Sequence, residues 1–198
     1  MITISEASCP VHWQRATALL WDYVTWIREA AGLDPLIEQP SFRAEIDRLD
    51  AAYAGDDAVL YIASERARIG SGDDDDDGDG ESDGERVVGT VAVRHHADGS
   101  SELKRLYVDP GCRGRGLARR LVEQAVDAAT ARGSTSIWLE SVRGLMDQAI
   151  ALYERHGFVQ VPRVDVSFRV AGMVVMERRL CSPVRPPVGY PPVNRPSV

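Results

Sequence analysis

One stretch of the sequence, residues 103–118, has the residue types and spacing of an anion-binding turn. A run of strand-forming residues, 103–108, stops at a D-P-G sequence, and the glycine-spaced turn 113–116 then opens a helix-like run over 117–132. Glycine lets the backbone come close to a ligand, and the first amides of a helix have no partners within it. The stretch therefore predicts a strand, a turn and a helix N-terminus that together bind an anion.

Two common phosphate-binding motifs do not fit this turn. After Gly114 and Gly116, a dinucleotide-binding fingerprint would place a third glycine where this sequence has Arg119. The sequence contains no G-K-S or G-K-T, which excludes the phosphate loop of nucleotide triphosphatases. The alternative to anion binding is a strand-to-helix connection that holds no ligand.

The composition predicts one globular domain with a sizeable core, because the 198 residues are 44% hydrophobic and 27% charged. The net charge of -7 comes from one segment: nine acidic residues lie in 73–85, which leaves about +2 for the rest of the chain. Such a balance excludes nucleic-acid binding driven by charge.

Cysteine usage and hydropathy exclude further classes. Cys9, Cys112 and Cys181 are far apart and form no C-x-x-C pair, so neither a zinc site nor a disulfide framework is indicated. The N-terminus has no basic segment followed by an apolar one, and no apolar run reaches the length of a membrane span. We expect a soluble cytoplasmic protein, monomeric or homodimeric, with no metal, membrane or nucleic-acid partner.

The hydrophobic pattern predicts a mixed α/β (α+β) fold with a central sheet flanked by helices. The expected helices are residues 10–31, 41–53, 117–132 and 146–156, with Ser41 as the N-cap of the second. The expected strands are residues 2–5, 58–63, 87–93, 103–108, 135–139, 158–161 and 172–180. The helix at 10–31 carries an aromatic stripe that belongs to the core, or else contributes Trp13, Tyr23 or Trp26 to a pocket.

Two segments are expected to stay outside this domain, which we assign to residues 1–180. Residues 72–85 form an acidic, disordered hairpin loop, since they include no apolar residue to bury. A calcium loop is the alternative there, but its twelfth position is Gly84 and not the glutamate that the geometry needs. Residues 181–198 contain six prolines and predict a flexible tail.

Two motifs resemble hallmarks of the GNAT-type N-acetyltransferase superfamily, and the segment 102–108 resembles that of its bacterial small-molecule branch. The first is Arg113-x-x-Gly116-x-Ala118 after a strand ending in Y-V-D-P, and it resembles the acyl-CoA-binding turn. The second is A-I-A-L-Y at 149–153 followed by G-F at 157–158. The resemblance covers residues 87–161 and implies a mostly antiparallel sheet whose two central strands splay apart.

The resemblance implies that acetyl-CoA is the acyl donor. Amides of the turn would bind its pyrophosphate, and the side chains of Arg113, Arg115, Arg119 and Arg120 would add positive charge. The strand before the turn would pair with the pantetheine arm, and the amide of Val108 would face the thioester carbonyl. The residues so assigned to acetyl-CoA are Leu106, Tyr107, Val108, Arg113, Gly114, Arg115, Gly116, Leu117 and Ala118.

The resemblance also implies an acid and a base. Tyr153 would protonate the leaving thiolate, and its alternative is a core or rim tyrosine. Glu102 would deprotonate the amine through water. Strand alternation would put Glu102, Lys104, Leu106 and Val108 on one face, directed toward the cleft.

Other assignments of the base stay open. Glu102 is equally well explained as a surface carboxylate near Lys104 or Arg105, and Glu140, His95 and His96 are rival bases. One residue departs from the family pattern: Met146 stands where an asparagine often contacts the pantetheine arm.

The sequence thus predicts direct acetyl transfer from acetyl-CoA to a primary amine of a small molecule or amino acid. Cys112 lies beside the turn but has no base partner in the sequence, so a covalent cysteine intermediate is not expected. Two alternatives are a protein lysine or N-terminal acetyltransferase and, from another class, a non-catalytic acetyl-CoA-binding regulatory module.

Overall fold

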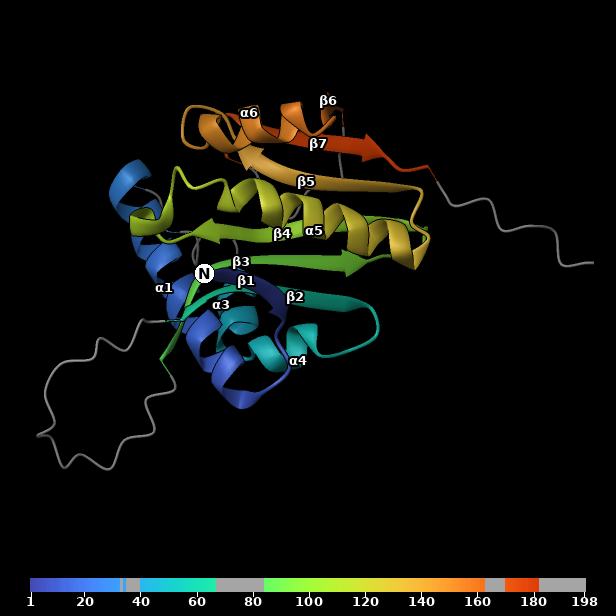
Figure 1. The fold of residues 1–198 in the computed structure, drawn as a ribbon. Helices are drawn as coiled ribbons and strands as arrows, with labels where there is room; N and C mark the ends of the chain where they lie inside the picture. The colour runs from blue at the N-terminus through green and yellow to red at the C-terminus, as the bar shows by residue number, and fades with distance from the viewer. Residues whose placement is uncertain (33, 35–39, 67–83, 163–169, 182–198) are drawn as a thin grey trace, which may run out of the picture.

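A seven-stranded sheet with helices on both faces makes up the structure, a computed structural model that describes residues 1–32, 34, 40–66, 84–162 and 170–181 (Figure 1). The strand order is β1-β2-β3-β4-β5-β7-β6, and every neighbouring pair is antiparallel except β4 and β5. The strands are β1 (Ile2–Glu6), β2 (Ala58–Arg66), β3 (Glu85–His95), β4 (Ser100–Val108), β5 (Ser136–Val142), β6 (Val159–Val161) and β7 (Met173–Arg179). This mixed, mostly antiparallel sheet confirms the predicted fold class.

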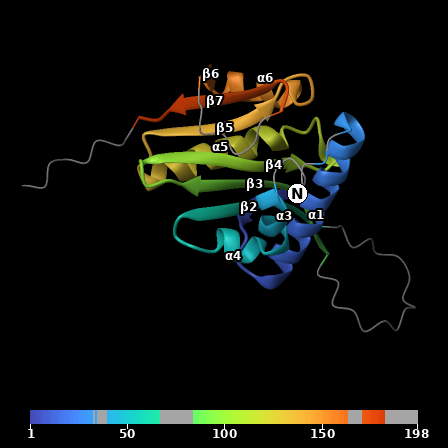
Figure 2. The same cartoon turned by 180° about the vertical axis from the view of Figure 1, so that it is seen from behind.

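The helices form two layers, one on each face of the sheet (Figure 2). Residues of α5 (Leu117–Arg132) and α6 (Asp147–Arg155) share one buried cluster with the sheet. Residues of α1 (Pro10–Ala31), α3 (Pro40–Asp47) and α4 (Leu49–Tyr53) share the other. None of the helices within the described ranges is long and apolar enough to cross a bilayer.

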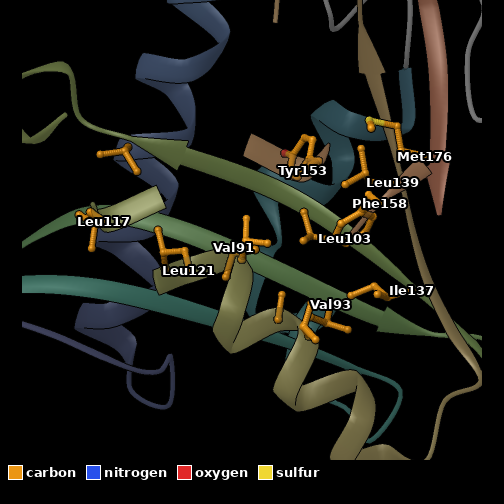
Figure 3. Packing of buried hydrophobic residues seen from close by; sticks show 14 of the residues in the cluster. Val91, Val93, Leu103, Leu117, Leu121, Ile137, Leu139, Tyr153, Phe158 and Met176 are labelled. Carbon is orange, nitrogen blue, oxygen red and sulfur yellow. The ribbon is translucent and has the colours of Figure 1, made fainter. Parts of the chain in front are cut away.

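Strand alternation explains why both faces of the central strands are apolar. On β3, Val91 and Val93 pack toward α5, where Leu121 of α5 and Leu103 of β4 lie beside them (Figure 3). The intervening Ala92 is equally buried, in the cluster beneath α1. Each fully buried valine or leucine stabilises the fold by roughly 1.5–3 kcal/mol, so a central strand covered on both faces is strongly held.

The two central strands separate along their length. β4 and β5 pair only from Ser100 to Glu102, opposite Ser136 to Trp138, although both strands continue well beyond these residues. The rest of β5 pairs with β7 on its other side. This is the splay that the resemblance predicted, and beyond Glu102 it leaves this edge of β4 without a strand partner among the described residues.

One predicted helix was wrong. The expected helix over 41–53 is two helices, because the backbone of Arg48 is non-helical (φ -136°, ψ 52°). The first of them starts at Pro40, so Ser41 lies inside it and is not the N-cap. Proline fits the first helical turn, where its missing N–H removes no helix hydrogen bond.

Several predicted boundaries fall outside the described residues. The acidic stretch 73–83, with its calcium-loop alternative, and the tail from 182 onward are among them. A single domain over 1–180 followed by a tail stays a prediction.

Candidate active site

A cleft of about 1580 Å³ follows the splay between β4 and β5. Its walls come from β4, β5, α1, α6 and the first turn of α5. Ten residues predicted for the site line it: Glu102, Leu106, Tyr107, Val108, Arg113, Gly114, Gly116, Leu117, Ala118 and Tyr153. The cleft therefore brings together predicted residues that lie up to about a quarter of the chain apart in sequence, while Arg115 is absent from its lining.

The turn before α5 presents open backbone. Gly114 and Gly116 have φ values of 74° and 73°, and a Cβ on either would meet no atom within 4 Å. Gly116 is the N-cap of α5 and offers no side chain to cap the first amides. These amides lack partners within the helix, so the helix N-terminus can bind an anion in the cleft.

Two arginines near the start of α5, Arg115 and Arg120, make contacts outside the cleft. The guanidinium of Arg115 donates to Glu65 at 3.0 Å, and that of Arg120 donates to the carbonyl of Ile2 at 3.2 Å. Neither side chain lines the cleft. β1 and β2 thus supply acceptors for both guanidinium groups, and a contribution of these two side chains to anion binding stays a prediction.

Arg113 lies in the cleft but turns back onto the strand. Its Nε donates to the carbonyl of Val108 at 3.1 Å. Its guanidinium carbon lies 5.7 Å from the ring centre of Tyr107 and 5.8 Å from that of Trp26, within cation–π range. Arg113 therefore joins the turn, the end of β4 and α1 into one wall.

At the rim of the cleft formed by α5, α6 and β7, the positive charge of the basic side chains is less neutralised. Arg119 pairs with Glu123 at 3.1 Å, and His156 lies 3.8 Å from the same carboxylate. Arg155 and Arg178 also line this part of the cleft. Arg119 and His156 thus lie near the same glutamate, and Arg155 and Arg178 add two guanidinium groups to this part of the lining, which favours a negatively charged ligand.

The backbone of β4 is irregular at Arg105, which has a φ of 56°. Thr90 of β3 faces Tyr107, but Ala92 faces Lys104, so β4 holds one extra residue between them. This β-bulge reverses the alternation beyond it. Leu103, before the bulge, packs on the α5 side, so its neighbours Glu102 and Lys104 alternate to the other face. Leu106 and Val108, after the bulge, pack on the α5 side, and Tyr107 packs beneath α1. The prediction that Glu102 and Lys104 share a face with Leu106 and Val108 was therefore wrong.

Glu102 is buried in the cleft wall. Glu102 is 6% exposed, and its carboxylate accepts a hydrogen bond from Lys104 Nζ at 2.8 Å. The Nε2 of His96 lies 3.5 Å from the other carboxylate oxygen. The alternative of a surface carboxylate was therefore wrong, although its proximity to Lys104 was predicted. A carboxylate at this position can take a proton from a group in the cleft.

Of the rival bases, only Glu140 lines the cleft. His95 and His96 lie at the far end of β3, where His95 Nδ1 contacts Ser101 Oγ at 2.8 Å. Burial and the nearby Arg132 lower the pKa of His95. The geometry favours Glu102 and Glu140 as proton acceptors over either histidine.

Tyr153 lies at the inner wall, with its ring 5.8 Å from that of Phe158 and beside Leu139 (Figure 3). Burial raises the pKa of its phenol well above the ordinary value, and Tyr23 adds to this shift. No hydrogen bond joins its hydroxyl to another described residue. A neutral phenol without a competing partner is free to donate a proton to a ligand.

The lining of the cleft includes a residue, Ser141, that the sequence did not single out. Ser141 on β5 is 3% exposed, and its hydroxyl is buried in the cleft wall without a hydrogen-bond partner among the described residues. Tyr23 and Trp26 of α1 line the cleft, whereas Trp13 packs in the core. The pocket alternative for the aromatic stripe thus holds for two of its three residues. Met146 lines the cleft as the N-cap of α6.

In the part of the chain that the structure describes, no three histidine, cysteine or acidic side chains are placed to hold a metal ion. The described cysteines are all free thiols, and only Cys112 is buried.

The splayed mixed sheet and the glycine turn in its cleft define an acetyltransferase type of fold. Residues 65–158 match the model of the Acetyltransferase (GNAT) family.

Known relatives match over short regions. The alanine N-acetyltransferase of ribosomal protein bS18 from Salmonella typhimurium is 46% identical over 56 residues, which is 28% of this chain and 37% of that protein. The uncharacterized N-acetyltransferase YjgM of Escherichia coli is 35% identical over 79 residues, 40% of this chain and 45% of YjgM. This chain spans from 20% to 47% of the length of the curated relatives that it matches.

Solved structures match over nearly the whole chain. A GNAT-family acetyltransferase of Staphylococcus aureus superposes with a TM-score of 0.65 at 16% identity, covering 91% of this chain and 100% of that one. The PaiA N-acetyltransferase of Thermoplasma acidophilum, solved with coenzyme A, has a TM-score of 0.56 at 16% identity, covering 91% and 99%. At these identities the matches establish the fold.

Proposed function

We propose that the protein transfers an acetyl group from acetyl-CoA directly to a primary amine of a small molecule or amino acid. The observation that carries the proposal is a single cleft in which the open glycine turn, the unpaired edge of β4 and the phenol of Tyr153 meet. A fold neighbour solved with coenzyme A supports the same ligand.

The donor fits the two ends of the cleft. Amides of the turn from Gly114 to Ala118 bind the pyrophosphate, helped by the positive end of the α5 dipole. The basic rim of Arg119 and Arg155 lies where further phosphate charge is stabilised. The backbone of Leu106, Tyr107 and Val108 binds the pantetheine arm along the open edge of β4, with the Val108 amide toward the thioester oxygen.

The remaining groups move protons. Glu102 accepts a proton from the amine, whose nitrogen then attacks the thioester carbon. The new N–C bond forms first and turns the thioester carbonyl oxygen into an oxyanion. When the carbonyl re-forms, the C–S bond breaks and Tyr153 donates its proton to the departing sulfur. Its raised pKa keeps the phenol protonated at neutral pH, which an acid requires. Val108 stabilises the oxyanion between these steps, and no covalent enzyme intermediate is needed.

A protein acceptor is the second candidate. Relatives that acetylate the alanine of ribosomal protein bS18 match this chain at 45–46% identity over 56 residues. Those residues are 28% of the chain, so the match is too short to transfer the acceptor of those proteins to this one.

The test is release of free thiol from acetyl-CoA across a panel of amines. Turnover with amino acids or polyamines supports the proposal, and turnover only with N-terminal or lysine peptides supports a protein acceptor. Acetyl-CoA binding without turnover on either panel would refute an enzyme and leave a binding module. We also propose a metal-free reaction, so a chelator should leave the rate unchanged. We further propose that the protein is cytoplasmic and either monomeric or homodimeric. Cell fractionation tests its location, and light scattering tests its oligomeric state.

A further inference from the structure

Arg105 at the β4 bulge has an unusual backbone. Of the described residues other than glycine, it is the one with a positive φ, 56°. An L-amino acid adopts this left-handed region only when its surroundings stabilise it, and asparagine or glycine would be the ordinary choice. Something outside the local sequence must therefore hold arginine in this conformation.

The side chain of Arg105 fixes this conformation by binding to α3. Its guanidinium makes two hydrogen bonds to the carboxylate of Glu45, at 2.5 and 2.8 Å. The same guanidinium lies 3.8 Å from the ring centre of Phe42, also on α3. The Arg105 side chain is only 9% exposed and that of Glu45 13%, so solvent screens this pair little.

Further contacts complete the network around the bulge. The hydroxyl of Tyr53 donates to Glu45 at 2.6 Å, and that of Thr90 donates to the carbonyl of Arg105 at 2.8 Å. Burial alone would raise the pKa of Glu45, but Arg105 and Tyr53 outweigh it and lower this pKa below the ordinary value. The carboxylate is thus ionised, and the bulge is fixed from α3 on one side and from β3 on the other.

The bulge decides where the backbone of the cleft lies, because Leu106, Tyr107 and Val108 follow it directly. We propose that Glu45 is a positioning residue for acyl transfer: through its ion pair with Arg105 it holds the bulge, and thereby the β4 backbone that faces the thioester. This inference rests on the proposed function. Buried ion pairs are weak evidence for stability and better explained by conformational specificity, which agrees with this role.

The test is Glu45→Gln, with Asp47→Asn as its matched control. Asp47 lies on the same helix, but it pairs with the exposed Arg43 and does not touch the bulge. Because a displacement of about 1 Å can cost ~100-fold in rate, we expect kcat of Glu45→Gln to fall ~10–100-fold. The KM for acetyl-CoA should change much less than kcat, since the turn at α5 that binds the pyrophosphate is untouched. Asp47→Asn should keep both constants.

A second substitution separates positioning from simple stability. Glycine adopts a positive φ without steric cost, so Glu45→Gln combined with Arg105→Gly should regain several-fold in kcat over Glu45→Gln alone. If the ion pair only stabilised the fold, each folded Glu45→Gln molecule would keep the wild-type kcat. Arg105→Gly would then restore no activity. That result would overturn the inference. If Glu45→Gln does not fold, Tyr53→Phe removes one hydrogen bond to Glu45, and an unchanged kcat there would overturn it.

A readout independent of turnover covers failure of the proposed function. If the wild-type protein acetylates no amine, the proposed function fails, but hydrogen exchange of the amides in 104–108 still tests the bulge. We expect faster exchange in Glu45→Gln than in Asp47→Asn. Equal exchange in the two variants would refute the hold of Glu45 on this backbone.

Discussion

The role of the glycine turn can be tested by comparing two glycines of the same helix, Gly116 and Gly133. Gly116 is the N-cap of α5 with φ 73°, and Gly133 is its C-cap with φ 84°. A Cβ at either position would meet no atom within 4 Å. Alanine in the left-handed region costs about 1–2 kcal/mol, so both substitutions should lower the Tm by roughly 2–8 °C.

Of these two glycines, only Gly116 lines the cleft. The Cβ of Gly116→Ala would occupy the space that we propose for the pyrophosphate and keep it from the first amides of α5. A hydrogen bond to a charged group contributes about 1.5–3 kcal/mol, so losing one should raise the Kd for acetyl-CoA about 10–150-fold. Gly133→Ala should keep the wild-type Kd within about twofold, because it carries the same backbone strain far from the ligand.

Isothermal titration calorimetry with acetyl-CoA measures both Kd values, and a thermal melt verifies that the two variants lose similar stability. If both variants bind equally weakly, the effect is general destabilisation and the site assignment is refuted. If Gly116→Ala binds as tightly as wild type, the anion does not lie on this turn.

Three further predictions concern proton transfer and pH. Tyr153→Phe should lower kcat at least ~100-fold in the thiol-release assay while sparing acetyl-CoA affinity; an unchanged rate would exclude it as the acid. Glu102→Gln should lower kcat ~100-fold or more, and if it does not, the same measurement on Glu140→Gln identifies the base. Because burial raises the pKa of Tyr53 in the folded state, the unfolded chain loses this proton first. Stability should therefore fall as pH rises above about 10, and more gently in Tyr53→Phe, as denaturant titrations at several pH values would show.

The sequence predicted the regular parts of the fold well, for identifiable reasons. The helices Pro10–Ala31 and Leu117–Arg132 have their predicted bounds, because proline or glycine marks an end of each and apolar residues recur at helical spacing between. The strands were found where β-branched residues cluster, although β2 and β3 continue into polar residues at their ends. The short helices α3 and α4 were merged, since no glycine or proline separates them.

The irregular part of the site was not predictable in the same way. The bulge at Arg105 breaks strand alternation without any glycine to signal it, because the conformation is held by Glu45, 60 residues earlier in the chain. The partners of Arg115 and Arg120 likewise come from distant strands. Local patterns predict local geometry, whereas these contacts depend on which elements the completed sheet brings together.

The same reasoning explains why the acceptor was harder to predict than the donor. The glycine turn and Tyr153 lie within the family-matched region 65–158, on the face of the sheet covered by α5 and α6. Across the splay, the cleft is lined by Tyr23, Trp26 and Phe42, which all precede that region. An amine that reaches the thioester from this side meets α1 and α3 first. Acceptor choice should therefore follow these aromatic residues, so that Trp26→Ala changes the ranking of amines while leaving the Kd for acetyl-CoA near its wild-type value.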